Sequence, residues 1–209
     1  MKKKIALLAG LVLCVLLGVR LYTSWQMVLA QNAAAIAPSG NVIGNPQGRL
    51  TIVEFVDYKC HFCPIMNERL LQVLATEKDV RIVVRPVPWI DKESEQIARL
   101  AVAAGMQGKD ILFHNAAMAT GGLKSYTEAL GIAQEIGVNL ERAEAAMRKP
   151  DIDAPLRANI ELTQAFNIQR IPGLLINGKV VFGTVEEELP TVNQLRILIS
   201  DAKGKLPPP

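Results

Sequence analysis

Cysteine and histidine are scarce in this sequence. Its 209 residues include three cysteines and two histidines. Cys14 lies inside an N-terminal apolar run and is expected to be an ordinary residue of that segment, which leaves Cys60 and Cys63. Two cysteines are too few for a disulfide-stapled scaffold. A structural zinc site needs four ligands, and besides Cys60, Cys63 and His61 only His114 is available, so we expect no metal. We expect His114 to lie on a helix surface or to cap a helix.

The sequence also lacks a large excess of either positive or negative charge. The chain has 23 basic and 20 acidic residues, and its formal net charge is +3. Three of the basic residues, Lys2–Lys4, stand together at the N-terminus, so the remainder is nearly neutral. No basic stripe is present that would follow a phosphate backbone, which excludes nucleic acid as an expected partner. Half of the residues are hydrophobic, enough for one domain with a well-filled core.

The N-terminus has the pattern of an export segment. Lys2–Lys4 precede an unbroken run of apolar and small residues from 5 to 19. Val28 and Ala30 then make a small-x-small pattern at which a signal peptidase would cut. We therefore expect export through the inner membrane of a bacterium and a periplasmic location.

Residues 1–30 are consistent with either a cleaved signal peptide or a retained membrane anchor. The apolar run is shorter than the ~20 residues that a spanning helix needs, which favours a signal. The gap from residue 19 to residue 30 is long for a cleavage region, and Tyr22 and Trp25 suit a membrane interface, which favours an anchor. If the segment is retained, the protein stays at the extracytoplasmic face of the inner membrane.

A strand, a helix and a second strand surround the cysteine pair. Residues 31–41 predict a linker to a domain over 42–205. Residues 49–58 are β-branched and aromatic, as in a buried strand, and 80–87 repeat that pattern. Between them, a helix is expected to begin at or just after Cys63. This order predicts a right-handed βαβ unit.

A block of roughly seventy residues, about 91–168, is helical in pattern. Its expected helices are 93–107, 110–120, 125–136, 140–148 and 154–166. The block is too long for one crossover helix, so it predicts a helical insertion packed on the sheet. After it, Asn177-Gly178 separates two short apolar segments and indicates a tight β-hairpin. Residues 191–202 predict a final amphipathic helix.

The stretch Cys60-His61-Phe62-Cys63 suits redox chemistry. Two cysteines three positions apart at a helix start close a disulfide with little backbone movement. Cys60 would face the free N–H groups of the first turn, which favour its thiolate, and we expect its sulfur to lie exposed. Cys63, one turn further and more buried, would be the less acidic, resolving thiol. A partner thiolate would attack Cys60 to give a mixed disulfide, which a second partner thiolate resolves.

The two residues between the cysteines are expected to modify this chemistry. A partly charged His61 would stabilise the Cys60 thiolate and hence the reduced form, which makes the disulfide more oxidising. The alternative is a solvent-facing His61 with no effect. Phe62 would contact partner proteins or cover the rim of the site.

The stretches "TIVEFVDYKCHFC" and "IPGLLINGK" together resemble the DsbA-type thiol oxidoreductases. The resemblance implies an α/β thioredoxin fold, a central mixed sheet flanked by helices, with an inserted helical domain. It implies that Pro172, preceded by Ile171, is a cis-proline that packs against the disulfide and leaves backbone free for a substrate peptide. An ordinary trans proline at the start of a strand is the alternative.

The same resemblance places Glu54 beneath the cysteines. A carboxylate in an apolar strand needs a reason, because unpaired burial is costly. Proton relay with Cys63 is one reason, and an ion pair with Arg85 on the neighbouring strand is another. Asp57, at the end of the strand, is expected to be a turn residue.

The resulting expectation is an exported thiol:disulfide oxidoreductase that acts as a protein dithiol oxidase. Cysteine-containing exported proteins would be its substrates, and a quinone-linked membrane partner would reoxidise it. No cofactor is needed, because the cysteines carry the electrons. An isomerase or reductase of the same fold is the second interpretation, and a non-enzymatic metal-binding protein the third.

Overall fold

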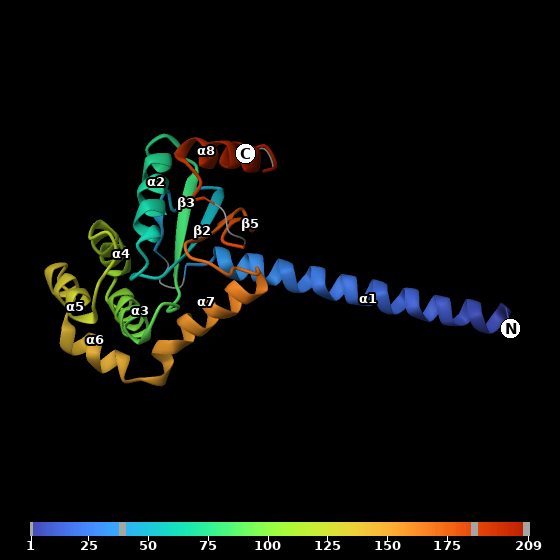
Figure 1. The fold of residues 1–209 in the computed structure, drawn as a ribbon, viewed down its shortest axis with the longest axis horizontal. Helices are drawn as coiled ribbons and strands as arrows, with labels where there is room; N and C mark the ends of the chain where they lie inside the picture. Colours follow the sequence, from blue (N-terminus) through green and yellow to red (C-terminus); the bar gives the residue numbers. More distant parts are fainter. Residues whose placement is uncertain (1, 38–40, 185–187, 207–209) are drawn as a thin grey trace.

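The computed structural model describes residues 2–37, 41–184 and 188–206, and Figure 1 shows their arrangement. Five strands form one mixed sheet in the order β1-β3-β2-β4-β5. The parallel pair β2 and β3 is the predicted βαβ unit, and the other neighbours are antiparallel. The strands are β1 (Ile43–Gly44), β2 (Leu50–Val56), β3 (Val80–Pro86), β4 (Gly173–Ile176) and β5 (Lys179–Phe182).

The central strand β2 is buried at all seven positions, because both faces of the sheet are covered. On one face, residues such as Ile52 pack against α2 (Phe62–Thr76) and α8 (Val192–Lys203). On the other, Val53 and Phe55 pack against α7 (Ala154–Ala165). Successive side chains of a strand point to opposite faces, so Glu54 shares the α2 face.

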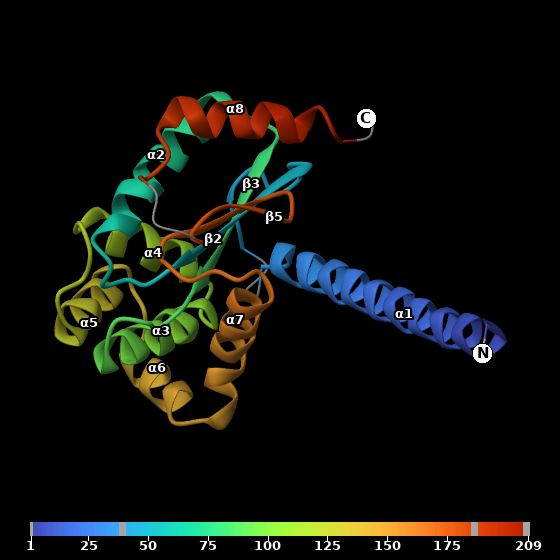
Figure 2. The same ribbon diagram turned by 45° about the vertical axis from the view of Figure 1, so that its right-hand side comes forward.

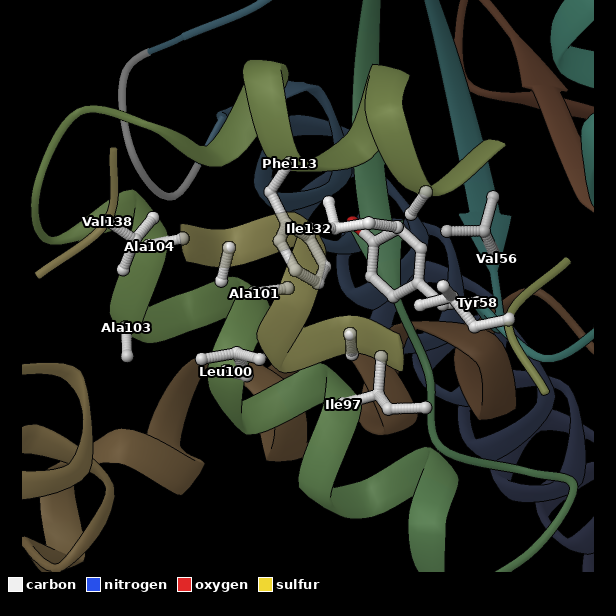
Figure 3. Close-up of a cluster of buried hydrophobic side chains, with 14 of the residues drawn as sticks. Val56, Tyr58, Ile97, Leu100, Ala101, Ala103, Ala104, Phe113, Ile132 and Val138 are labelled. Atoms are coloured by element: carbon white, nitrogen blue, oxygen red, sulfur yellow. The ribbon is translucent and has the colours of Figure 1, made fainter. Parts of the chain in front are cut away.

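The predicted helical insertion lies at the end of β2 and β3 where the cysteines follow. Its helices are α3 (Lys92–Gly105), α4 (Asp110–Ala119), α5 (Tyr126–Glu135), α6 (Leu140–Met147) and, after a short 3-10 turn over Pro150–Asp153, α7. The α3, α4 and α5 side chains enclose Tyr58 in one apolar cluster (Figure 3). The same cluster includes both cysteines, so the insertion packs against one side of the cysteine pair.

The hairpin between β4 and β5 confirms its sequence signal. Asn177 and Gly178 both have positive φ, 47° and 75°. This is the backbone that a two-residue turn of the predicted kind requires, and asparagine and glycine adopt it most easily. The turn brings β5 back beside β4, and β4 itself pairs with β2, so Pro172 directly precedes a strand that lies next to β2.

The N-terminal helix is longer than the sequence patterns indicated. α1 (Lys2–Ala35) projects from the domain (Figures 1 and 2) and includes the segment Gly10–Ala35, long and apolar enough to cross a membrane. The linker expected from residue 31 is helical as far as Ala35, which corrects that boundary. Alanine is the best helix former, and the chain here reads QNAAA.

The end of α1 is docked on the domain. Its last turns contact α7 and β2, and Ala34 is buried. The Arg85 guanidinium, from β3, donates to the carbonyl oxygens of Ala33, Ala34 and Ile36. Carbonyls at a helix C-terminus lack partners within the helix, and a cation there stabilises them.

Candidate active site

The two cysteines lie where β2 leads into α2. The Cys60 N–H donates to the Asp57 carbonyl oxygen at 3.0 Å, which closes a tight turn after the strand. α2 begins at Phe62, one residue earlier than the predicted start, and His61 occupies its N-cap position without a capping side-chain bond. The first N–H groups of the helix are therefore free to interact with the Cys60 sulfur.

Cys60 is an acidic thiol. Its pKa is lowered to about 6, chiefly because the Cys63 thiol donates a hydrogen bond to the sulfur. The backbone N–H groups of Phe62 and Cys63 lower the pKa further, and the charge of His61 contributes least, while partial burial opposes all three. At neutral pH Cys60 is accordingly a thiolate, the nucleophilic form of cysteine.

Cys63 has the opposite character. It is completely buried, and burial raises its pKa well above the ordinary value. Its hydrogen bond to Cys60 and the negative charges of Cys60 and Glu54 act in the same direction. The pair thus combines one thiolate with one thiol that keeps its proton, as an attacking and a resolving cysteine require.

Cys60 is more buried than the sequence led us to expect, since the residue as a whole is only 6% exposed. Two segments far along the chain contact this residue. Gly122 lies so close that a Cβ atom there would be 3.3 Å from the Cys60 carbonyl oxygen. The Cys60 sulfur lies 3.8 Å from the Ile171 carbonyl oxygen. Phe62, 45% exposed, and His61 form the accessible surface, with ring centroids 4.0 Å apart.

The Ile171–Pro172 peptide bond is cis, as the resemblance implied. Gly173, the next residue, pairs with Phe55 near the end of β2. This register carries Ile171 and Pro172 to the end of the sheet where the cysteines lie. The predicted late proline and the cysteine pair, more than a hundred residues apart, are therefore parts of one site.

Glu54 is fully buried, and neither carboxyl oxygen has a hydrogen-bond partner among the described residues. Burial, and secondarily the charge of Cys60, raise its pKa to about 8. The alternative of an ion pair with Arg85 is wrong. In the parallel register Glu54 lies beside Val84, whereas Arg85 lies beside Phe55 and faces the other side of the sheet. There Arg85 donates to the Asn159 side chain at 3.0 Å.

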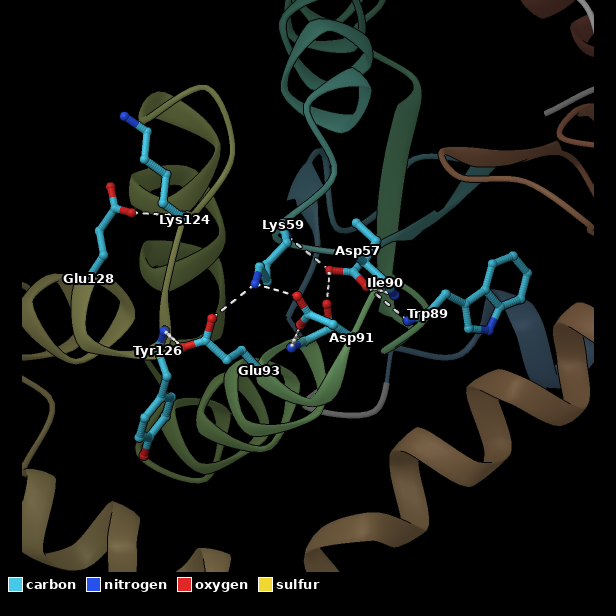
Figure 4. Close-up of polar contacts among 10 residues, drawn as sticks. Asp57, Lys59, Trp89, Ile90, Asp91, Glu93, Lys124, Tyr126 and Glu128 are labelled. Carbon is cyan, nitrogen blue, oxygen red and sulfur yellow. Dashed lines mark hydrogen bonds and ion pairs between the residues drawn. The ribbon is translucent and has the colours of Figure 1, made fainter.

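Asp57 is a turn residue, as expected, but it also connects the redox loop to the insertion (Figure 4). One carboxylate oxygen accepts from the Lys59 N–H and the Ser94 hydroxyl, each at 2.9 Å. The other accepts from the N–H groups of Trp89 at 2.8 Å and Ile90 at 3.0 Å. The sequence carries no signal for this, because three of the donors come from residues more than thirty positions away.

Lys59 makes a second connection. Its ammonium group contacts Asp91 at 2.6 Å and Glu93 at 3.0 Å, both at the start of α3 (Figure 4). Within the described ranges, no group of three His, Cys, Asp or Glu side chains is arranged to hold a metal ion.

His114 is not the surface or capping residue that we expected. It is 1% exposed, in the middle of α4, and its Nε2 lies 3.1 Å from the Asn67 side-chain oxygen on α2. The sequence gives no indication of this burial, because His114 becomes enclosed only when α4 packs against α2 and Tyr58.

Residues 37–201 match the family model described as thioredoxin. The chain belongs to the thioredoxin family. A thioredoxin-like oxidoreductase from Silicibacter pomeroyi has 30% sequence identity, with a TM-score of 0.75 over 84% of this chain and 98% of that one. Its similarity and the family match confirm the DsbA-like resemblance and the thioredoxin fold.

More distant structures share the fold. The catalytic domain of Proteus mirabilis ScsC is 18% identical, with a TM-score of 0.71 over 86% of this thioredoxin-family protein and 98% of that chain. The thiol-disulfide exchange protein α-DsbA2 from Wolbachia pipientis is 19% identical, with a TM-score of 0.67 over 84% of this chain and 97% of that chain.

A curated relative is much longer. A Na⁺/H⁺ antiporter, NhaA 1 of Salinispora arenicola, is 23% identical over 150 residues, which are 71% of this chain but 23% of the antiporter. The protein thus spans less than a quarter of that relative.

Proposed function

We propose that this thioredoxin-family protein is an exported thiol:disulfide oxidoreductase that transfers a Cys60–Cys63 disulfide to cysteine pairs of other exported proteins. The observation that carries the proposal is the contrast between the two thiols, with the pKa of Cys60 near 6 and that of buried Cys63 raised. The fold and the family support it.

The reaction follows from that contrast. A substrate thiolate attacks the Cys60 sulfur of the disulfide, the bond to Cys63 breaks, and Cys63 leaves with the electron pair. Cys63 then takes a proton, for which we propose buried Glu54, with a pKa near 8, as the source. A second substrate thiolate attacks the substrate sulfur of the mixed disulfide and releases Cys60 as a thiolate. The substrate loses two electrons, and the protein gains them as a reduced cysteine pair.

The stabilised Cys60 thiolate favours oxidation of the substrate. Any contact that stabilises the thiolate stabilises the reduced protein, and this makes the disulfide a stronger oxidant. The hydrogen bonds to Cys60 supply that stabilisation, with His61 as a minor contributor. The Ile171 carbonyl faces Cys60, so a substrate chain lying along Ile171–Pro172 would bring its cysteine to that sulfur, with Phe62 as an apolar contact beside it.

Replacing Cys63 with serine tests the mechanism. In Cys63→Ser the Cys60 thiolate attacks a disulfide of an exported protein, and that bond breaks to release one of the protein's two sulfurs as a thiolate. Cys63 is then missing as the thiol that would displace the protein from Cys60, so the mixed disulfide should persist. We expect Cys63→Ser, in a Cys14→Ser background, to collect reductant-sensitive adducts with exported proteins, visible on non-reducing gels and assigned by mass spectrometry. The matched control, Cys60→Ser with Cys63→Ser, should collect none. Adducts that form equally in both proteins would contradict the mechanism.

We further propose that α1 is retained as a membrane anchor. The last turns of α1 dock on the domain, and the 20 residues before them, 10–29, span about 30 Å as a helix, which matches the ~30 Å hydrocarbon core. Lys2–Lys4 would mark the cytoplasmic end. The domain would then lie outside the inner membrane, close to a quinone-linked membrane partner that restores the disulfide.

The anchor is tested on the protein as it matures in a bacterial host. We expect the full-length mass in the membrane fraction after an alkaline wash. A soluble periplasmic product with Gln31 as its first residue would show instead that the segment is a cleaved signal. That result would leave the redox chemistry untouched.

A further inference from the structure

The helix α4 of the insertion and the loop after it contact the redox loop on both sides. On the helix side, His114 contacts Asn67, which is four residues after Cys63 on α2. On the strand side, the rings of Phe113 and His114 pack edge-on against Tyr58, two residues before Cys60, at centroid distances of 5.4 and 6.0 Å. Two adjacent residues of α4 thus reach both ends of the cysteine-bearing segment.

The loop after α4 extends this contact. The Leu123 N–H donates to the Tyr58 carbonyl oxygen at 2.8 Å. Gly122, with φ of +106°, lies against the backbone of Cys60 and His61. The residues that hold the redox loop from this side therefore follow one another within a dozen positions of the insertion.

The atoms that meet in the His114–Asn67 contact show which residue donates the hydrogen bond and which accepts it. The Asn67 oxygen only accepts, so Nε2 of His114 carries the proton and donates. Burial lowers the pKa of His114 to about 4, so the ring remains neutral and keeps this arrangement at physiological pH. A buried donor and a nearly buried acceptor fix each other, because losing either partner leaves the other unsatisfied.

We propose that His114 is a positioning residue for the redox pair: through Asn67 and Tyr58 it holds the start of α2 in register with the end of β2, and so aims the first N–H groups of α2 at the Cys60 sulfur. Hydrogen bonds weaken steeply with misalignment, so a small shift of α2 against the strand end would remove much of the support for the thiolate. The inference rests on the proposed role of Cys60 as the reacting thiol.

The experiment compares His114→Leu with His114→Gln in a Cys14→Ser background. Leucine fills the space but donates nothing, whereas the glutamine amide carries an N–H group at about the position of Nε2. The measurement is the rate of Cys60 alkylation by iodoacetamide from pH 4 to 9, with the modified residue located by mass spectrometry. We expect His114→Leu to raise the midpoint by half a pH unit or more, about a threefold loss of thiolate relative to thiol, and His114→Gln to restore it.

Two further variants separate positioning from general destabilisation. Thr163→Val removes a buried hydroxyl on α7 whose hydrogen bond stays within its own helix, and it should lower stability without moving the midpoint. Asn67→Ala removes the acceptor from the other side and should reproduce the shift if His114→Leu does not fold.

An unchanged midpoint in folded His114→Leu, or in Asn67→Ala, overturns the inference. If the unmodified protein itself titrates as an ordinary cysteine, the proposed function fails instead.

Discussion

Cys60→Ser should abolish disulfide transfer to a reduced two-cysteine peptide. A serine hydroxyl forms no disulfide with Cys63 and no mixed disulfide with substrate, so we expect the rate to fall by about 10³-fold or more, to background. The assay starts from oxidised protein and follows loss of peptide thiols by chromatography at pH 7.

The control for this experiment is Cys14→Ser, because Cys14 is the third thiol of the chain and lies on exposed α1. It should oxidise the peptide at the unmodified rate. Retention of more than a few per cent of activity in Cys60→Ser would mean that Cys63 or Cys14 carries the chemistry. The proposed function would then be wrong.

Glu54→Gln should change how stability depends on pH. The pKa of Glu54 is about 8 in the folded protein and near 4.5 in the unfolded chain. Between these values the folded state holds a proton that the unfolded state has lost, so the contribution of Glu54 to stability is complete below about pH 4.5 and disappears as pH rises to about 8. The expected slope is a loss of about 1.4 kcal/mol of unfolding free energy per pH unit.

The measurement is denaturant unfolding of the oxidised protein from pH 5 to 8.5. Oxidation matters because Cys60, whose pKa is lowered in the reduced protein, would contribute an opposite slope above about pH 6. Burial, the main cause of the raised Glu54 pKa, remains in the oxidised form. The difference between the unmodified protein and Glu54→Gln isolates Glu54, and equal slopes in the two proteins would contradict the prediction.

The same variant tests the proton relay. Glutamine has no titratable proton, so Cys63 would leave the disulfide without a nearby proton donor in an environment that strongly disfavours its thiolate. We expect formation of the mixed disulfide to slow by about tenfold or more. An unchanged rate would assign Glu54 no part in the transfer.

Local patterns predicted most of the fold. The hairpin at Asn177-Gly178 follows from the two residues that tolerate positive φ, and the insertion helices follow from apolar spacing and glycine breaks. The cysteine pair can be recognised from four consecutive residues, 60–63, and the late proline from two, Ile171 and Pro172. These features need no knowledge of what packs against them.

The features that sequence reasoning missed all depend on which elements meet. An ion pair between Arg85 and Glu54 is one of two explanations that the sequence allows, because adjacent strands carry both residues, but the register puts them on opposite faces of the sheet. The burial of His114 and of Cys60 depends on contacts across about fifty residues or more. The extension of α1 to Ala35 reflects docking on β3 through Arg85, which a composition-based linker boundary does not include.

The burial of Cys60 has a consequence for the timing of the reaction. Gly122 lies against the Cys60 backbone, and the Ile171 carbonyl oxygen lies 3.8 Å from the Cys60 sulfur. Cys60 as a whole is only 6% exposed, whereas Phe62 is 45% exposed. The cysteine of a finished, compact globule would be held back by its own neighbours. A newly translocated, unfolded chain can bring its thiol up to a largely buried residue, so we expect this protein to act on its clients before they acquire their final shape.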